Sequence, residues 1–316
     1  MVVLYCLSAL IAVILCAAYV MFRLVFRSPN RTQNDDFCIP RSDQTEPLYD
    51  TITEMIRAVN ALPYERVGVT SFDGLHLYGR YYHQKDGAPV AILFHGYRGT
   101  PSRDFSGGMQ FYRSKGLNIL MIEQRAHCTS EGHVIAFGVN ERRDCMTWID
   151  YVRGRFGAQT PVLLCGISMG AATVLMASGM ALPENVKGVI ADAPFTNPKE
   201  IIRKVCGDLR LPPRVIWPFL ALGARIFGRF DLRAADAAEA VGHSPVPILL
   251  IHGEDDRFVP CEMGKRIAAA APDTVELHTF PNAGHGLSFL TDRLRYERIT
   301  EAFLARVLDR TEETRA

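Results

Sequence analysis

The apolar residues of this chain form one long run at its start and a series of short runs after residue 65. Val2–Phe22 contains 21 residues without a charge. At about 1.5 Å per residue, a helix of this length crosses a hydrocarbon layer of about 30 Å. No Lys or Arg precedes the run and its exit is a poor cleavage site, which favours an uncleaved anchor over a signal peptide. We therefore predict a transmembrane anchor over residues 1–27.

The charges beside this span indicate its orientation. Arg23, Arg27 and Arg31 follow it, whereas only the amine of the chain precedes it. The positive-inside rule then places the rest of the chain in the cytoplasm. Eight scattered cysteines, with no Cys-x-x-Cys pair, favour a reducing compartment and indicate no metal or redox motif. We expect a single-pass protein of the cell membrane with a cytoplasmic domain.

Two segments separate the anchor from the short apolar runs. Residues 28–46 are polar and contain Pro, Asn, Asp and Arg, so we predict a linker there. Pro47–Leu62 has Ile52, Ile56 and Val59 at helical spacing, which predicts an amphipathic helix against the domain. The folded domain is expected over residues 47–316.

The short runs predict strands. Runs 66–71 and 75–83, separated by Phe72-Asp73-Gly74, are typical of a β-hairpin. Helix-length segments separate the next six runs, which are Pro89–Phe94, Leu117–Ile122, Val162–Cys165, Val186–Ala191, Ile248–Ile251 and Val275–Phe280. This alternation predicts an α/β fold, with a mostly parallel sheet flanked by helices and ligands at the carboxyl ends of its strands.

One strand end carries a candidate nucleophile. The run 162–165 leads into Gly166-Ile167-Ser168-Met169-Gly170, and an Ala-rich segment follows. This G-x-S-x-G pattern between a strand and a helix is a nucleophile elbow, in which glycines allow a sharp turn that exposes the Ser168 hydroxyl. A serine hydroxyl needs a base, and the base needs an orienting third group.

Two later strand ends supply these partners. The stretch H-G-E-D-D-R-F-V-P begins at His252, and N-A-G-H-G places His285 between glycines. We predict His285 as the base, in preference to His252, and Asp256 as the acid, with Asp255 as the alternative. Asp192, which follows another strand, is a second possible acid position. For it we favour a role in capping the turn beside Pro194.

From Val67 to Leu308 the chain resembles the α/β-hydrolase superfamily, including its serine-aminopeptidase-like branch, in its Ser–Asp–His order. The family pattern H-G-x-x-D-x-x-V-P maps the acid onto Asp256. The resemblance implies an oxyanion hole made by the backbone N–H groups of Met169 and Tyr97. Tyr97 lies in a His-Gly stretch whose histidine, His95, is expected to be structural. No metal or organic cofactor is implied.

A second loop also resembles the family. Residues 123–132 are similar to its D-x-R-x-x-G-x-S loop, but Glu123 replaces the usual Asp and Cys128 replaces the usual Gly. Without a paired base in the sequence, the Cys128 thiol is expected to be inert.

The insertion Pro198–Arg233 is where this family usually carries a cap. It is rich in aromatic and aliphatic residues and contains eight Lys or Arg against three acidic residues, a net charge of +5. We expect a helical cap over about 198–233 that lines the pocket and selects an apolar acyl group. Its basic and apolar surface either packs over the site or contacts anionic lipid.

Together these features predict a membrane-anchored serine hydrolase that cleaves a carboxylic ester of a small or lipid-like molecule. A serine peptidase and a membrane-tethered binding protein without catalysis are the alternatives. The formal charge is +1, and no basic run is interleaved with aromatics, so we expect no nucleic-acid partner.

Overall fold

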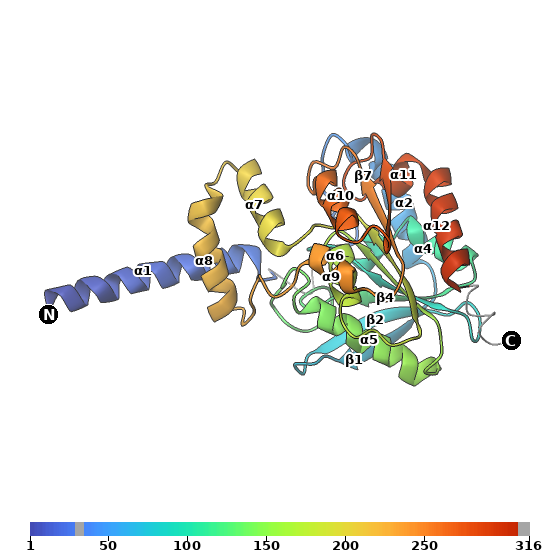
Figure 1. Ribbon diagram of the computed structural model, residues 1–316, viewed down its shortest axis with the longest axis horizontal. Coiled ribbons are helices and arrows are strands. Elements are labelled where there is room, and N and C mark those ends of the chain that lie inside the picture. The colour runs from blue at the N-terminus through green and yellow to red at the C-terminus, as the bar shows by residue number, and fades with distance from the viewer. Residues whose placement is uncertain (29–34, 309–316) are drawn as a thin grey trace.

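An eight-stranded sheet forms the centre of the computed structural model, which describes residues 1–28 and 35–308 (Figure 1). Its strands lie in the order β1-β2-β4-β3-β5-β6-β7-β8. The first two form an antiparallel hairpin, and the strands from β4 to β8 run parallel. The predicted mostly parallel α/β sheet is therefore confirmed. The strands are β1 (Glu65–Thr70), β2 (His76–Tyr82), β3 (Val90–Phe94), β4 (Asn118–Glu123), β5 (Val162–Ile167), β6 (Val186–Asp192), β7 (Ile248–Gly253) and β8 (Val275–Phe280).

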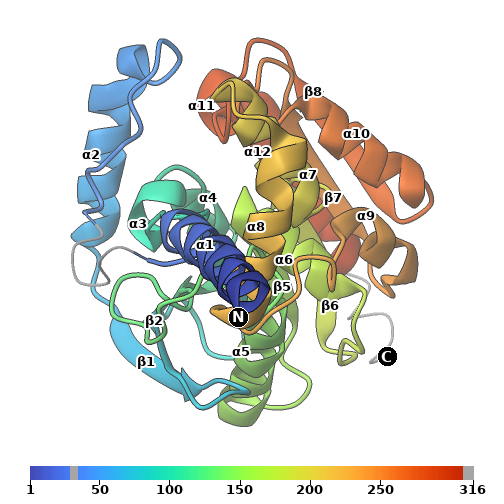
Figure 2. The same cartoon turned by 90° about the vertical axis from the view of Figure 1, so that its left-hand side faces the viewer.

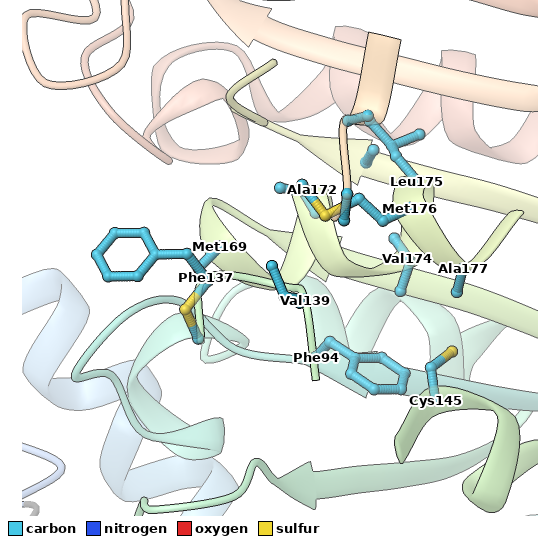
Figure 3. Close-up of a cluster of buried hydrophobic side chains, with 14 of the residues drawn as sticks. Phe94, Phe137, Val139, Cys145, Met169, Ala172, Val174, Leu175, Met176 and Ala177 are labelled. Carbon is cyan, nitrogen blue, oxygen red and sulfur yellow. The ribbon is translucent and has the colours of Figure 1, made fainter. Parts of the chain in front are cut away.

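Helices cover both faces of this sheet, which explains why its central strands are apolar throughout. One face packs against α5, α6 and α10, and the other packs against α4 and α12. Figure 3 shows part of the first core, where Cys145 of α5 and Val174 and Ala177 of α6 lie near Phe94 of β3. The domain helices are η1 (Glu46–Leu48), α2 (Tyr49–Asn60), α3 (Pro101–Asp104), α4 (Gly108–Ser114), α5 (Glu141–Phe156), α6 (Met169–Ser178), α9 (Ala237–Ala240), η2 (Val241–His243), α10 (Cys261–Ala270), α11 (Ser288–Thr291) and α12 (Arg293–Leu308).

The first helix, α1 (Val2–Val25), projects away from the domain (Figure 1). It is long and apolar enough to cross a membrane and is exposed along most of its length. Its last turns enter the domain, where Ala18 and Phe22 are buried. Just beyond the helix, the fully buried Phe26 packs edge-on against Phe137 and Phe230.

The insertion at 198–233 forms two helices, α7 (Pro198–Asp208) and α8 (Pro213–Ile226). Figures 1 and 2 show α8 lying across α1. Gly223 permits this crossing, because a Cβ at that position would collide with the carbonyl oxygen of Ala18. The two helices therefore approach at backbone distance.

The segment predicted as a linker lies partly outside the described residues, which omit 29–34. Its residues 35–45 contain no helix or strand but lie against the domain, and its last residue, Glu46, begins η1. Asp43 pairs with Arg257 at 2.6 Å, and the Gln44 side chain donates to the carbonyl of Asp255 at 3.1 Å. Ile39 in the same segment is buried.

Candidate active site

Ser168 occupies a sharp turn between β5 and α6. Its φ of 56° lies in the left-handed region, which a residue other than glycine adopts only when its surroundings impose it. A Cβ on Gly170 would collide with the Phe94 carbonyl, and one on Gly166 would collide with the backbone of Gly170. Both glycines of the predicted elbow are therefore needed for this close approach of strands and helix.

His285 contacts Ser168 and Asp256 at the same time. Its Nε2 lies 2.9 Å from Ser168 Oγ, and its Nδ1 lies 2.6 Å from Asp256 Oδ2. An ionised carboxylate only accepts hydrogen bonds, so Nδ1 carries the imidazole proton and Nε2 can accept from the serine hydroxyl. Asp256 is 88 positions from Ser168 and 29 positions from His285 in the sequence, and the fold brings all three into one hydrogen-bonded chain.

The surroundings of Asp256 favour its ionised form. Burial alone would raise its pKa, but the neighbouring His252 imidazole and hydrogen bonds from His285 and the backbone N–H of Val259 hold the pKa well below the usual range. The N–H of Phe258 also donates to this carboxylate, at 2.9 Å. The neighbouring Asp255 is exposed, and no hydrogen bond joins its carboxylate to His285 within the described part of the chain.

His252 has a role that sequence reasoning did not assign. It is fully buried, and its Nε2 donates to the carbonyl of Val259 at 2.9 Å while lying 3.5 Å from Asp256 Oδ2. Its ring therefore connects both ends of the loop that carries Asp256. The only sequence signal was its place at the start of the H-G-x-x-D pattern.

The residues predicted to form the oxyanion hole lie beside Ser168. A Cβ on Gly96, next to Tyr97, would be 3.3 Å from Ser168 Cβ. Within residues 1–28 and 35–308, the backbone N–H groups of Tyr97 and Met169 donate to no other group. Free backbone donors next to a serine hydroxyl are what an oxyanion requires.

Buried side chains hold this loop in place. Asp104 accepts from the N–H of Gly96 at 2.6 Å, and His127 Nε2 accepts from the N–H of Arg98 at 3.0 Å. The side-chain amide of Gln124 donates to the carbonyl of His95. Burial lowers the pKa of His95, and burial beside His95 lowers the pKa of His127 to about 3. Both imidazoles are neutral at pH 7 and act as fixed hydrogen-bonding groups, in line with the structural role expected of His95.

The same loop is joined to the end of α1. The Tyr97 hydroxyl donates to the carbonyl of Val25 at 2.7 Å, and the Arg98 guanidinium donates to that of Leu24 at 2.8 Å. The last carbonyls of a helix have no partner within the helix, so these side chains satisfy them. The apolar N-terminal helix thus ends directly on the loop that carries a candidate oxyanion donor.

A cavity of about 510 Å³ opens beside Ser168 and His285. Its apolar walls come from the segment at 39–45, α2, the α3–α4 region, the loop after β7, and α11 with the loop before it. They include Ile39, Ile52, Phe105, Phe258, Phe289 and Leu290. None of the described residues that line it belongs to Pro198–Arg233, so the prediction that this insertion lines the pocket is wrong. The reason is that α8 packs against α1 instead.

Asp192 lies in the wall of this cavity, and among the described residues its carboxylate accepts from no turn N–H, contrary to the expected capping role. Burial raises the pKa of its carboxyl to about 7, with the hydroxyl of Tyr296 acting in the opposite direction. Its Oδ1 is buried without a hydrogen-bond partner among the described residues. The carbonyl of Asp192 accepts from the N–H of Ser168 at 2.8 Å, which ties β6 to the elbow.

The loop at 123–132 departs from the family pattern at two positions, Glu123 and Cys128. Cys128, at the position where the pattern has Gly, has a φ of 47°. The buried Arg125 fastens the loop to the domain, because it binds Asp144 at 2.5 Å and Asp73 at 3.0 Å. Among the described residues, no group of His, Cys, Asp or Glu is arranged to hold a metal ion.

Comparison with known proteins agrees with this architecture. The family model described as "Alpha/beta hydrolase family" matches residues 91–298, and the chain belongs to that family. The uncharacterized protein YqkD of Bacillus subtilis (strain 168) is 21% identical over 311 residues, which cover 98% of this chain and 99% of YqkD. The lysophosphatidylserine lipase ABHD12 of Danio rerio is 29% identical over 210 residues, which cover 64% of this chain and 51% of ABHD12. The chain therefore matches about half the length of that lipase.

Solved structures share the fold. The esterase Pf2001 of Pyrococcus furiosus superposes with a TM-score of 0.65 at 18% identity, covering 90% of this chain and 98% of the esterase. The acylaminoacyl peptidase of Pyrococcus horikoshii gives a TM-score of 0.60 at 18% identity, covering 81% of this chain and 43% of the peptidase. The fold thus occurs in both an esterase and a peptidase, and it does not by itself define the bond that is cleaved.

Proposed function

We propose that this protein is a serine hydrolase that cleaves carboxylic esters through an acyl-enzyme on Ser168. The observation that carries the proposal is the hydrogen-bonded chain from Ser168 Oγ through His285 to Asp256, with distances of 2.9 and 2.6 Å, at the side of an apolar cavity. In this arrangement a neutral imidazole can remove the serine proton as the hydroxyl attacks.

In the first half of the reaction, Ser168 Oγ attacks the ester carbonyl and its proton passes to His285 Nε2. The carbonyl oxygen becomes an oxyanion, which accepts hydrogen bonds from the backbone N–H groups of Tyr97 and Met169. Asp256 stabilises the imidazolium through its hydrogen bond to Nδ1. The tetrahedral intermediate then expels the alcohol, which takes the proton from His285 and leaves an acyl-serine.

In the second half, water enters the site and His285 removes one of its protons. The resulting hydroxide attacks the acyl carbonyl, and the same two N–H groups stabilise the second oxyanion. Collapse of this intermediate breaks the bond to Ser168 Oγ, which regains its proton from His285. The products are a carboxylic acid and free enzyme.

The lining of the cavity supports a substrate whose acyl group is apolar and binds in this cavity. Its walls are mostly aliphatic and aromatic, and such walls favour longer acyl chains by about 0.8 kcal/mol per buried methylene. The name of one relative, a lysophosphatidylserine lipase, points in the same direction. A small or lipid-like ester is therefore the proposed substrate class.

The proposed setting of this reaction is the membrane surface. The length, hydropathy and exposure of α1 support a single transmembrane anchor. Arg23 and Arg27 at its carboxyl end support a domain on the cytoplasmic side.

A rate series on the full-length protein tests the proposal. Acyl p-nitrophenyl esters of increasing length are compared with amino-acid p-nitroanilides, with Ser168→Ala as the matched control. We expect ester hydrolysis that rises from acetyl toward medium-length chains and is lost in Ser168→Ala. The Leu290→Trp variant, which narrows the cavity, should shift the optimum to shorter chains. Faster cleavage of the anilides would identify a peptidase, and no hydrolysis of either series would favour a binding protein.

A further inference from the structure

The part of α1 that stands clear of the domain is too short to span a bilayer by itself. Residues 2–17 precede its first buried residue, Ala18. Sixteen residues rise about 24 Å along a helix axis. A hydrocarbon layer is about 30 Å thick. If α1 spans it, the hydrocarbon must therefore extend to the level of Ala18–Phe22.

Helix α8 crosses α1 at this level. Gly223 of α8 contacts the carbonyl of Ala18, and the ring of Phe227, just after α8, packs 5.1 Å from Tyr19 and 5.9 Å from Phe22. Figures 1 and 2 show α8 lying across the direction of α1 instead of along it. A helix in that position lies roughly in the plane of the membrane, at the boundary between hydrocarbon and headgroups.

The outward face of α8 has the composition of an interfacial helix. Val215 and Ile226 are 59% and 47% exposed, and Pro218 and Leu222 continue the same face at spacings of three and four residues. The turn from α7 into α8 adds two more exposed leucines, Leu209 and Leu211. A contiguous exposed apolar strip of this kind indicates a contact surface.

Basic side chains border this apolar strip. Arg210, Arg214, Arg225 and Arg229 are all exposed, and α8 contains no acidic residue. A helix with an apolar face and flanking arginines binds anionic lipid surfaces, each cation adding about 1 kcal/mol near the membrane. Since α7 and α8 do not line the cavity, packing over the active site does not explain this face.

We propose that α8 and the α7–α8 turn form a membrane-docking surface that lies on the same bilayer that α1 spans and binds anionic headgroups through its arginines. This inference rests on the anchoring role proposed for α1 but not on the hydrolytic activity. It makes the insertion a platform that holds the domain against the lipid surface.

Fluorescence quenching by brominated phospholipids tests the position of α8. Single Trp substitutions are made at Val215 and Ile226, and at Leu294 of α12 as the control, because Leu294 is also apolar and is 81% exposed. All three variants also carry Trp217→Phe. The buried Trp148 is then the only other tryptophan that contributes to their fluorescence. The full-length proteins are reconstituted into vesicles that contain brominated phosphatidylcholine and phosphatidylglycerol.

We expect Val215→Trp and Ile226→Trp to lose much of their emission, while Leu294→Trp retains its own. Changing Arg214, Arg225 and Arg229 together to Gln should reduce the quenching, as should high salt. Alkaline extraction of the vesicles distinguishes failure of the docking surface from failure of the anchor. If the protein stays in the membrane but the α8 positions are quenched no more than Leu294→Trp, the docking surface is overturned and α8 faces a protein partner or solvent. Release of the protein would overturn the anchor and the docking surface together.

Discussion

Two adjacent carboxylates at the end of β7 have entirely different surroundings. Asp256 is buried and accepts from His285 and from two backbone N–H groups, whereas Asp255 is exposed. The consequence is that only Asp256 can fix the tautomer of the imidazole.

Replacing each of the two with Asn tests this assignment. Asp256→Asn should lower kcat by about 10⁴, because an amide at that position favours the wrong tautomer of His285. Asp255→Asn should leave kcat unchanged. The measurement is turnover of a single p-nitrophenyl ester by both variants, and loss of activity in Asp255→Asn alone would show that the acid is misassigned.

The raised pKa of Asp192 has a consequence for stability. Its value is about 7 in the folded protein and 3.8 without the fold, because burial disfavours the charge. Between these values the folded state keeps a proton that the unfolded state has released. The folded state binds more protons, so the contribution of Asp192 to stability falls as pH rises from about 4 to about 7.

The neutral variant Asp192→Asn should remove this dependence. The Tm of the variant minus the Tm of the wild type should therefore be more positive at pH 8 than at pH 5. Thermal unfolding of both proteins at the two pH values measures it. An equal difference at both values would mean that Asp192 is already ionised in the folded protein at pH 5.

The residues that belong to local motifs could be predicted from the sequence. Ser168, Asp256 and His285 each follow a recognisable strand, so their meeting at one edge of the sheet could be anticipated. The burial of Asp192 and His252 could not, because it depends on tertiary packing, such as that of Tyr296 in α12 beside Asp192. No local pattern reports such a contact.

Side-chain hydrogen bonds join the end of α1 to the loop after β3. The Tyr97 hydroxyl and the Arg98 guanidinium satisfy carbonyls at the end of α1, and the N–H of Tyr97 is a proposed oxyanion donor. A change in the hydroxyl contact should therefore alter catalysis without removing any atom that touches the substrate.

The variant Tyr97→Phe isolates this effect, because it keeps the ring and the backbone N–H. Loss of one hydrogen bond, about 1 kcal/mol, should lower kcat by about fivefold with little change in KM. Tyr151→Phe is the matched control, since its hydroxyl bonds Arg155 on the surface of α5. A kcat equal to that of the wild type would show that the contact of the Tyr97 hydroxyl with α1 does not position the loop for catalysis.

The strands and most helices were predictable from hydrophobic periodicity, but the placement of two segments was not. Residues 39–45 look like a polar linker, yet they form part of the cavity wall. The insertion at 198–233 looks like a lid, yet it packs on α1. Gly223 and Ala18 are 205 positions apart in the chain, and nothing local to either predicts that they touch.

The N-terminal helix α1 contacts both the loop beside the active site and the insertion at 198–233, and it is also the proposed membrane anchor. The arginines after the span predict that the domain faces the cytoplasm. Protease added to intact cells, or to spheroplasts where an outer membrane exists, should spare the domain and digest it only after lysis. Digestion of the domain before lysis would reverse the proposed orientation.

In the proposed mechanism, His285 activates Ser168 as a nucleophile. A fluorophosphonate probe reacts covalently with such a serine, and mass spectrometry of the labelled protein identifies the modified residue. We expect one adduct on Ser168, absent from Ser168→Ala and strongly reduced in His285→Ala. An adduct on another residue, or no adduct in a preparation that hydrolyses esters, would show that Ser168 is not the nucleophile.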